Sequence, residues 1–173
     1  MSSIIKVDQI QLADGSTPTA GDLGLNTTGS VLQVVQDTQT TQVVVSATSF
    51  IASPLSATIT PSATSSKILV VVSYHGGPVN SSAADANATF ALSRDAGSTY
   101  LAFNGIRGYD YGGSGTIVFT TNTMVYLDSP SSTSSLTYTV YHKKNDGNSL
   151  YLCPNDLDNR DTLSSITLME IAG

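Results

Sequence analysis

The stretch that decides the fold is SSKILVVVSYH, residues 65–75. Its centre, Ile68 to Val72, is a continuous apolar run dominated by β-branched side chains, which favour strands over helices. The run is far shorter than the ~18 apolar residues that a membrane-spanning helix requires. We therefore expect residues 65–75 to form a central strand of a sheet, buried on both faces.

Further strand patterns occur on both sides of this run, at the spacing typical of a sandwich or barrel. The alternation of apolar and polar residues predicts these inward side chains: Leu55, Ala57, Ile59, Phe90, Leu92, Leu136, Tyr138, Val140 and His142. Residues 116–130 form the longest expected β run, and residues 162–172 form the last one. Asn145–Gly147 is a turn signal. Residues 97–115, rich in glycine and aromatic residues, are expected to form a loop around at most one short strand.

The composition agrees with an all-β chain. The 173 residues include a single glutamate, Glu170, and four lysines, so residues that favour helices are scarce. No internal repeat of 20–50 residues points to a propeller or a solenoid. We predict an antiparallel, jelly-roll-like β-sandwich over residues 31–173, preceded by an extended anchor segment over residues 1–30.

The charge of the chain excludes one class of partner. Thirteen acidic residues outnumber seven Lys and Arg, which gives a net charge of −6, and the basic residues are scattered. Such a chain repels a phosphate backbone, so we predict no binding to nucleic acid. The longest apolar run is too short for membrane insertion. Cys153 is the only cysteine, which rules out an intrachain disulfide.

The chain opens with a short apolar peptide that has too little around it to be buried. Its aliphatic side chains are Ile4, Ile5, Val7, Ile10 and Leu12. Because Lys6 and Asp8 interrupt the peptide and no basic stretch precedes it, it does not fit a secretory signal peptide. Residues 14–29 are dense in Gly, Thr, Asp and Asn, as in a linker. The peptide is therefore expected to belong to some other surface.

An acidic loop near the C-terminus is the one candidate metal site. Asp156, Asp158 and Asp161 lie close together, and clustered oxygen ligands suit calcium. However, Arg160 lies among them, and the glycine and distal glutamate of an EF-hand loop are missing. Either a solvated acidic turn or an ion site fits this pattern. We predict no metal and no cofactor, and keep the three aspartates as weak candidates.

Catalytic patterns are absent elsewhere. Only His75 and His142 are available to a mechanism that depends on histidine, and no serine lies in a nucleophile motif. Glu170 alternates with strand residues, so it is either a buried acid with a partner or an outward-facing strand residue. An enzyme that cleaves polysaccharides would need Glu170 or the acidic-loop aspartates as paired acids. We predict that the protein is not an enzyme.

The best candidate for surface recognition is the stretch GIRGYDYGGSG, residues 105–115. It gathers Arg107, Tyr109, Asp110 and Tyr111 between glycines. Tyrosine and arginine suit recognition, because a rigid amphipathic ring gives a large contact area at a small entropy cost. The patch fits stacking on a sugar or contact with a protein partner. The alternative is that the tyrosines cap the end of the sandwich.

Several blocks of sequence resemble a known group of proteins. SSIIKVDQIQLADGSTP, residues 2–18, resembles the N-terminal attachment motif of tail-fibre-like virion proteins of bacteriophages, notably marine and cyanobacterial ones. The distal module of those proteins is similar to VLQVVQ (31–36), LSATITPSATSSKILVVVSY (55–74), VYLDSPSSTSSLTYTVYHKK (125–144) and SSITLMEIAG (164–173). These blocks cover about half of the chain and are spread over its whole length.

The resemblance implies a structural protein of the virion, made in the host cytoplasm, with other virion proteins of the capsid, tail or an adaptor as partners. It implies a homotrimer that forms a short fibre or appendage, docked to the particle through Ile4, Ile5, Val7, Ile10 and Leu12. Here the attachment peptide passes into the β region within about thirty residues, without the shaft of a long fibre. A capsid decoration or cement protein therefore fits as well, and so does a carbohydrate-binding tip that contacts a host surface glycan.

Overall fold

The structure, a computed structural model of the chain, describes residues 10–19, 21–24, 27–80, 85–109, 115–154 and 161–173. The described residues contain strands and no helix. The strands are β1 (Val31–Gln39), β2 (Val43–Val45), β3 (Ile51–Ile59), β4 (Lys67–Asn80), β5 (Ala86–Ser93), β6 (Ala102–Gly108), β7 (Thr116–Ile117), β8 (Thr120–Asp128), β9 (Leu136–Asp146), β10 (Ser149–Leu152) and β11 (Ser164–Ile171).

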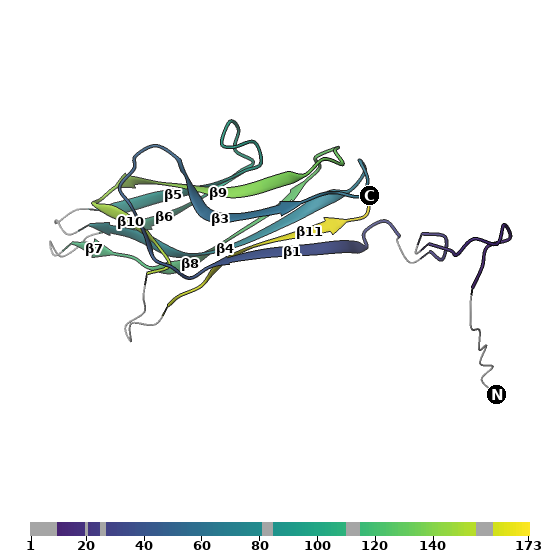
Figure 1. Cartoon of the computed structure of the whole chain (residues 1–173). Coiled ribbons are helices and arrows are strands. Elements are labelled where there is room, and N and C mark those ends of the chain that lie inside the picture. Colours follow the sequence, from purple (N-terminus) through teal and green to yellow (C-terminus); the bar gives the residue numbers. More distant parts are fainter. Residues whose placement is uncertain (1–9, 20, 25–26, 81–84, 110–114, 155–160) are drawn as a thin grey trace.

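Eight of these strands form two antiparallel sheets that face each other (Figure 1). One sheet has the order β1-β11-β4-β8, and the other has the order β3-β9-β5-β6. The first four strands therefore pair with the last four in reverse order, as β1–β11, β3–β9, β4–β8 and β5–β6. This reversed pairing is the topology of a jelly-roll sandwich, so the predicted fold class is confirmed.

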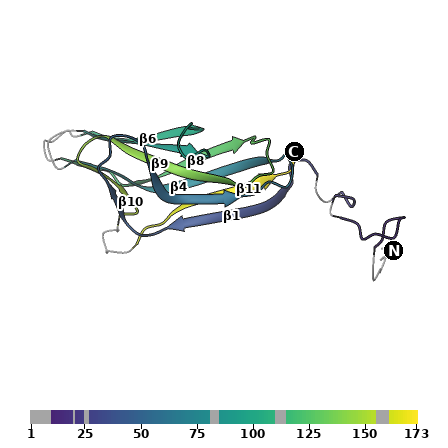
Figure 2. The same cartoon turned by 45° about the horizontal axis from the view of Figure 1, so that its top comes forward.

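The sandwich has two distinct ends. At the proximal end, Val31 pairs with Ile171, which in turn pairs with Lys67. Residues 10–19 and 21–24 lie beyond this end (Figures 1 and 2). At the distal end, Asn80 pairs with Thr116. Three short strands, β2, β7 and β10, widen the first sheet toward the distal end. β7 and β10 pair with the last five residues of β4, and β2 pairs with β10.

The core lies between the two sheets and is continuous. Its largest fully buried side chains include two tyrosines and a phenylalanine, namely Tyr74, Tyr138 and Phe90. The rings of Tyr74 and Phe90 lie 4.0 Å apart between their centroids. The inward positions predicted by alternation are buried, except that Leu136 is half-buried at the start of its strand.

The prediction for residues 65–75 is right about position and wrong about burial. β4 is the central strand, paired with β11 on one side and β8 on the other. Its inner side chains, such as Val70, are fully buried, but Leu69 and Val71 on the outer face remain partly exposed. No described segment forms a third layer over this face, so only one side of the strand meets the core.

The prediction that residues 116–130 form the longest β run is wrong. The run is divided into β7 and β8, and the longest strand is β4 with 14 residues. The interruption at Val118 and Phe119 lies opposite Gly77 and Pro78 of β4. Proline has no N–H group with which to continue the hydrogen-bonded ladder, so the strand breaks there.

Two other local predictions are confirmed. The region 97–115 contains one strand, β6, within its described part. The turn predicted at Asn145–Gly147 joins β9 to β10, and Gly147 has a φ of 90°, a left-handed conformation that glycine adopts readily.

Candidate functional site

A groove of about 440 Å³ crosses the outer face of the second sheet. β5, β6 and β9 form it near the distal end, and its lining includes Asn87, Thr89, Gly105, Arg107, Asn145 and Asp146. Gly105 leaves the floor of the groove open because it has no side chain. A Cβ atom at this position would point outward from the sheet and would lie 3.4 Å from the Ala88 carbonyl oxygen. The groove is thus an exposed recess on a rigid sheet.

Hydrogen bonds hold the polar walls of the groove in place. Asn87 Nδ2 donates to Asp146 Oδ2 over 2.7 Å, and Asn145 Nδ2 donates to Thr89 Oγ1 over 2.7 Å. Asn87 Oδ1 is buried and has no hydrogen-bond partner within the described part of the chain. A buried oxygen without a partner is costly, so this atom is poised to accept a hydrogen bond from a water molecule or a ligand.

Arg107 and Tyr109 lie at the rim of the groove. The Arg107 guanidinium carbon is 4.8 Å from the centre of the Tyr109 ring, and the tyrosine is 51% exposed. The cation–π contact holds an aromatic surface toward solvent. Asp110 and Tyr111, which the sequence analysis grouped with them, lie outside the described residues.

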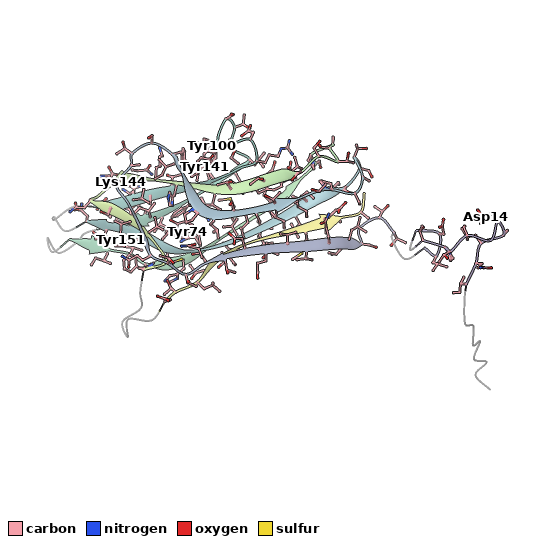
Figure 3. All side chains as sticks on the ribbon, viewed as in Figure 1. Asp14, Tyr74, Tyr100, Tyr141, Lys144 and Tyr151 are labelled. Carbon is pink, nitrogen blue, oxygen red and sulfur yellow. The ribbon has the colours of Figure 1, made fainter. Side chains whose placement is uncertain are left out.

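An aromatic cluster that the sequence analysis missed occupies the same sheet face. The Phe50, Tyr100 and Phe103 rings have centroids 4.7–6.1 Å apart, and the Tyr141 ring meets Tyr100 edge-on at 5.6 Å. Figure 3 shows Tyr100 and Tyr141 close together on this side of the sandwich. Phe103 is 60% exposed, so the outer face of the second sheet combines polar and aromatic surface.

The described part of the N-terminal segment is exposed. Ile10, Leu12 and Leu23 have 50%, 38% and 46% of their surface accessible to solvent. The hydrogen bonds of this segment are local: Ser16 donates to Asp14, and Thr19 donates to Asp22.

The segment joins the sandwich through backbone hydrogen bonds that Gly29 and Ser30 make with Ala172. Ile4, Ile5 and Val7 lie outside the described residues.

Glu170 is a buried carboxylate at the proximal end, 1% exposed, with a complete set of partners. The Ser62 backbone N–H, the Ser62 hydroxyl and the Ser66 hydroxyl donate to Oε1 over 2.6–2.7 Å, and Gln33 Nε2 donates to Oε2 over 2.6 Å. Burial alone would raise the pKa, but these hydrogen bonds outweigh it and lower the pKa of Glu170 to about 2. Of the two alternatives for Glu170, the structure shows the buried acid with partners.

A second buried carboxylate, Asp128, lies near the same end and is 5% exposed. Tyr138 Oη donates to its Oδ2 over 2.6 Å, and the Arg94 guanidinium forms an ion pair with the same oxygen. Burial, followed by the contact with Asp128, raises the pKa of Tyr138. Through these contacts Asp128 links β8, β9 and the segment after β5, so its role is structural.

Neither histidine lines the groove. His142 is 1% exposed in the core, its Nδ1 atom is 3.0 Å from the Tyr74 hydroxyl, and burial lowers its pKa to about 4. His75 lies on the outer face of β4 with Nδ1 2.9 Å from Thr121 Oγ1. Both partners are hydroxyl groups, so neither of these contacts joins a histidine to a carboxylate.

Cys153 is fully buried beside β11. Its thiol donates to the Gln39 carbonyl oxygen over 3.0 Å and lies 3.3 Å from Ser164 Oγ. Burial raises the pKa of the thiol, which keeps it protonated and unreactive near neutral pH.

The candidate acidic loop is only partly described. Asp156 and Asp158 lie outside the described residues, and Asp161 is exposed. Across the described part of the chain, no three His, Cys, Asp or Glu side chains come together as metal ligands do. Those residues also include no helix with the length and apolarity to span a membrane.

No protein-family model and no curated protein matches this chain. The solved structures to which this chain is similar include VP2 of infectious bursal disease virus in a subviral particle, with a TM-score of 0.43 and 14% identity over 82% of this chain and 33% of that chain. The Gx strain of infectious bursal disease virus gives a TM-score of 0.40 and 12% identity over 100% of this chain and 37% of that chain. The chain thus spans about a third of the length of these structures.

Proposed function

We propose that this protein is a non-enzymatic structural protein of a bacteriophage virion. In this proposal residues 1–30 supply the peptide that docks on the particle and the linker that follows it, and the sandwich of residues 31–173 stands exposed as a short trimeric appendage. The observation that carries the proposal is the contrast between the two segments. The sandwich buries a continuous core of its own, whereas Ile10 and Leu12 are 50% and 38% exposed. The bacteriophage assignment and the trimer are supported by the sequence blocks described above.

Docking would follow from the chemistry of the opening peptide. An extended segment adds to the edge of a neighbouring sheet or lies in a groove, where its backbone forms hydrogen bonds and its side chains fill pockets. Each buried aliphatic side chain contributes ~1.5–3 kcal/mol before the entropy of ordering is subtracted. Three linked copies bind together far more tightly than one copy alone. The particle's capsid, tail or adaptor proteins are the proposed partners.

The test is to delete residues 1–13 and to measure incorporation into particles produced without the wild-type protein. We expect a folded, soluble β domain that no longer joins the particle. A matched pair keeps the chain length: Ile10→Ser with Leu12→Ser should reduce incorporation, whereas Leu23→Ser, at a similarly exposed position outside the peptide, should not. Incorporation of the deleted chain at normal occupancy would exclude docking by this peptide.

A capsid decoration or cement protein is the nearest variant of this proposal. The short connection between the peptide and β1 favours it, because the sandwich would then lie close to the surface that the peptide binds. Labelled antibodies against the sandwich, viewed on intact particles, separate the two forms. Labels over the whole head indicate decoration, and labels at the tail or at a vertex indicate an appendage.

A second candidate function is glycan recognition in the distal groove. It is favoured by the unpartnered Asn87 Oδ1 beside Arg107 and the exposed Tyr109 ring. Sugars combine hydroxyl groups, which both donate and accept hydrogen bonds, with apolar faces that pack on aromatic rings. Planar amide, carboxylate and guanidinium groups around an aromatic surface match that chemistry. The strand segments that line the groove lie toward the end opposite the attachment segment (Figure 1), where a host surface would be met.

Gly105→Val tests this candidate, because it adds a side chain to the lining of the groove at a position where a Cβ atom would lie 3.4 Å from the Ala88 carbonyl oxygen. We expect binding of the protein to host cells and to arrayed host glycans to be lost in this variant and in Arg107→Ala with Tyr109→Ala. Thr123→Val, an exposed strand position on the other sheet, is the control. Unchanged cell binding by all variants would remove the groove as the glycan site.

A further inference from the structure

The outer face of the first sheet carries a continuous band of aliphatic side chains. It crosses all four strands of the sheet, β1, β11, β4 and β8. We call this band the outer apolar stripe, and its members are Val31, Val34, Leu69, Val71, Val125, Leu127, Met169 and Ile171. Val34, Val125 and Leu127 are 57%, 62% and 51% exposed. A contiguous apolar surface of this kind on a soluble protein marks a site of association.

Strand register aligns the members of the stripe. Val34 lies beside Met169, Met169 beside Leu69, and Leu69 beside Leu127, so one aliphatic row crosses the whole sheet. The next row, two residues along, contains Val71 and Val125 on β4 and β8, and its positions on β1 and β11 are the uncharged Gln36 and Thr167. The row on the other side contains Val31 and Ile171 beside Lys67. The alternate residues of the same strands point into the core, which means that the stripe belongs to the outer face and is not covered by the chain's own described residues.

The interior of the stripe carries no charge. The row of Val34 and Leu127 and the row of Val71 and Val125 have no Asp, Glu, Lys or Arg. The same is true of the following row of Ser and Thr, which contains Ser73 and Thr123. One cation, Lys67, lies at the proximal edge of the stripe beside Ile171. In a chain with a net charge of −6, copies repel one another over most of their surface. Away from Lys67, the outer apolar stripe is a face on which two copies meet without opposing or burying charges.

We propose that copies of this chain associate through the outer apolar stripe. The inference rests on the proposed homo-oligomer and supplies the surface for it. A second copy suits the stripe because the central strands β11 and β4 are paired on both sides, the face is a regular sheet, and most of its neighbouring polar groups are hydroxyls that reorient freely. Two such faces pack on each other as the sheets of a sandwich do, and three pack around a common axis.

The size of the stripe predicts how tight this association is. Four strands ~4.8 Å apart and three rows ~6.7 Å apart give a projected area of ~400 Å². A standard stable interface buries ~800 Å² per partner, so the stripe alone supports a contact that depends on concentration. Copies docked side by side on one particle are held at a high effective concentration, which converts a weak contact into a stable assembly.

Sedimentation velocity of the full chain, from ~1 µM to ~1 mM, tests the inference, since weak contacts dissociate in this range. We expect the mass to rise above the 18.0 kDa of one chain as concentration increases. Val125→Lys and, on the opposite edge strand, Val34→Lys should each weaken association by about 10-fold or more, because a lysine would be buried without a partner. Phe103→Lys is the matched control, since Phe103 is 60% exposed on the other sheet.

Each outcome separates this inference from the proposed docking. A monomer at every concentration overturns the inference, and the particle-incorporation experiment still decides docking on its own. An oligomer that Val125→Lys and Val34→Lys leave intact also overturns the stripe, while it leaves the proposed homo-oligomer in place. Both substituted positions are exposed, so circular dichroism and the unfolding midpoint should match wild type and show that the lysines act on association.

Discussion

The proximal and distal ends of the sandwich handle their polar groups in opposite ways. At the proximal end, Glu170 and Asp128 are buried, and partners from neighbouring strands and loops satisfy both carboxylates. At the distal end, the groove keeps Arg107 exposed and leaves Asn87 Oδ1 without a partner. The proximal end uses polar chemistry to hold the fold together, and the distal end presents polar chemistry to the outside.

The backbone differs between the two ends as well. The distal part of β4 contains Gly76 and Gly77, where the backbones of β10 and of Val118 come so close that a Cβ atom would lie 2.1 Å and 1.7 Å from their carbonyl oxygens. Close backbone packing therefore supports the short distal strands, whereas buried carboxylates support the proximal loops. The difference suggests that substitutions destabilise the two ends through different mechanisms.

The largest effect is expected for Gly77→Ala. The new methyl group would overlap the Val118 carbonyl, so either β4 or the segment before β8 must move. We expect a loss of about 3 kcal/mol or more in the free energy of unfolding, measured by urea denaturation. Gly105→Ala is the control and should change stability by less than about 1 kcal/mol, because its Cβ has 3.4 Å of space. A wild-type midpoint for Gly77→Ala would contradict the close packing.

Glu170→Gln should have the next largest effect. An amide in place of the carboxylate presents an NH₂ group to donors that now converge on oxygen, and it removes the negative charge that strengthens their hydrogen bonds. We expect about 2–3 kcal/mol of destabilisation by urea denaturation. Asp161→Asn, at an exposed aspartate, should be nearly neutral. Equal effects of the two substitutions would show that the proximal carboxylate does not hold the fold.

The burial of His142 predicts that the stability of the protein depends on pH, independently of the contrast between the two ends. Burial lowers its pKa from 6.5 to about 4 in the folded protein. Between these values the unfolded chain takes up a proton that the folded protein does not, so stability falls as pH falls from 6.5 to 4. The loss between pH 7 and pH 5 should be about 2 kcal/mol. His142→Gln should flatten this part of the profile, and a slope that survives in the variant would assign it to other groups.

The smallest stability effect is expected at the distal groove. Arg107→Ala and Tyr109→Ala remove exposed side chains whose mutual contact is a cation–π pair at the surface. Each should change the free energy of unfolding by less than about 0.5 kcal/mol. Thermal unfolding of both variants, compared with Glu170→Gln, checks the contrast between the ends. A loss as large as that of Glu170→Gln would mean that the groove residues are structural.

Much of the fold follows from alternation in the sequence. Leu55, Phe90 and Tyr138 were predicted inward because a strand with one buried face repeats with a period of two. Alternation fails where both faces are aliphatic, as at Leu69 and Val71, because the sequence does not reveal whether another layer covers the outer face. The break before β8 depends on Pro78 in another strand, so it could be recognised only once the pairing of the strands was known.

Only part of the candidate site was predictable, because the rest of it also depends on how the strands pair. Arg107 and Tyr109 were singled out because they lie in one short stretch with glycines. Asn87, Asn145 and Asp146 come from two other strands, and register alone brings them to the same groove. The sequence NDG indicated a turn, which was confirmed, but it gave no sign that its first two residues face a recess. Phe50 was likewise far in sequence from the aromatic residues that it meets.

The burial of Cys153 makes the protein well suited to site-specific labelling. The only native thiol of the chain is out of solvent, hydrogen-bonded and held in its protonated form. A cysteine introduced at an exposed position would therefore be the sole target of a maleimide dye while the protein stays folded. A fluorophore placed in this way on the N-terminal segment, and another on the distal groove, would report separately on what each one touches.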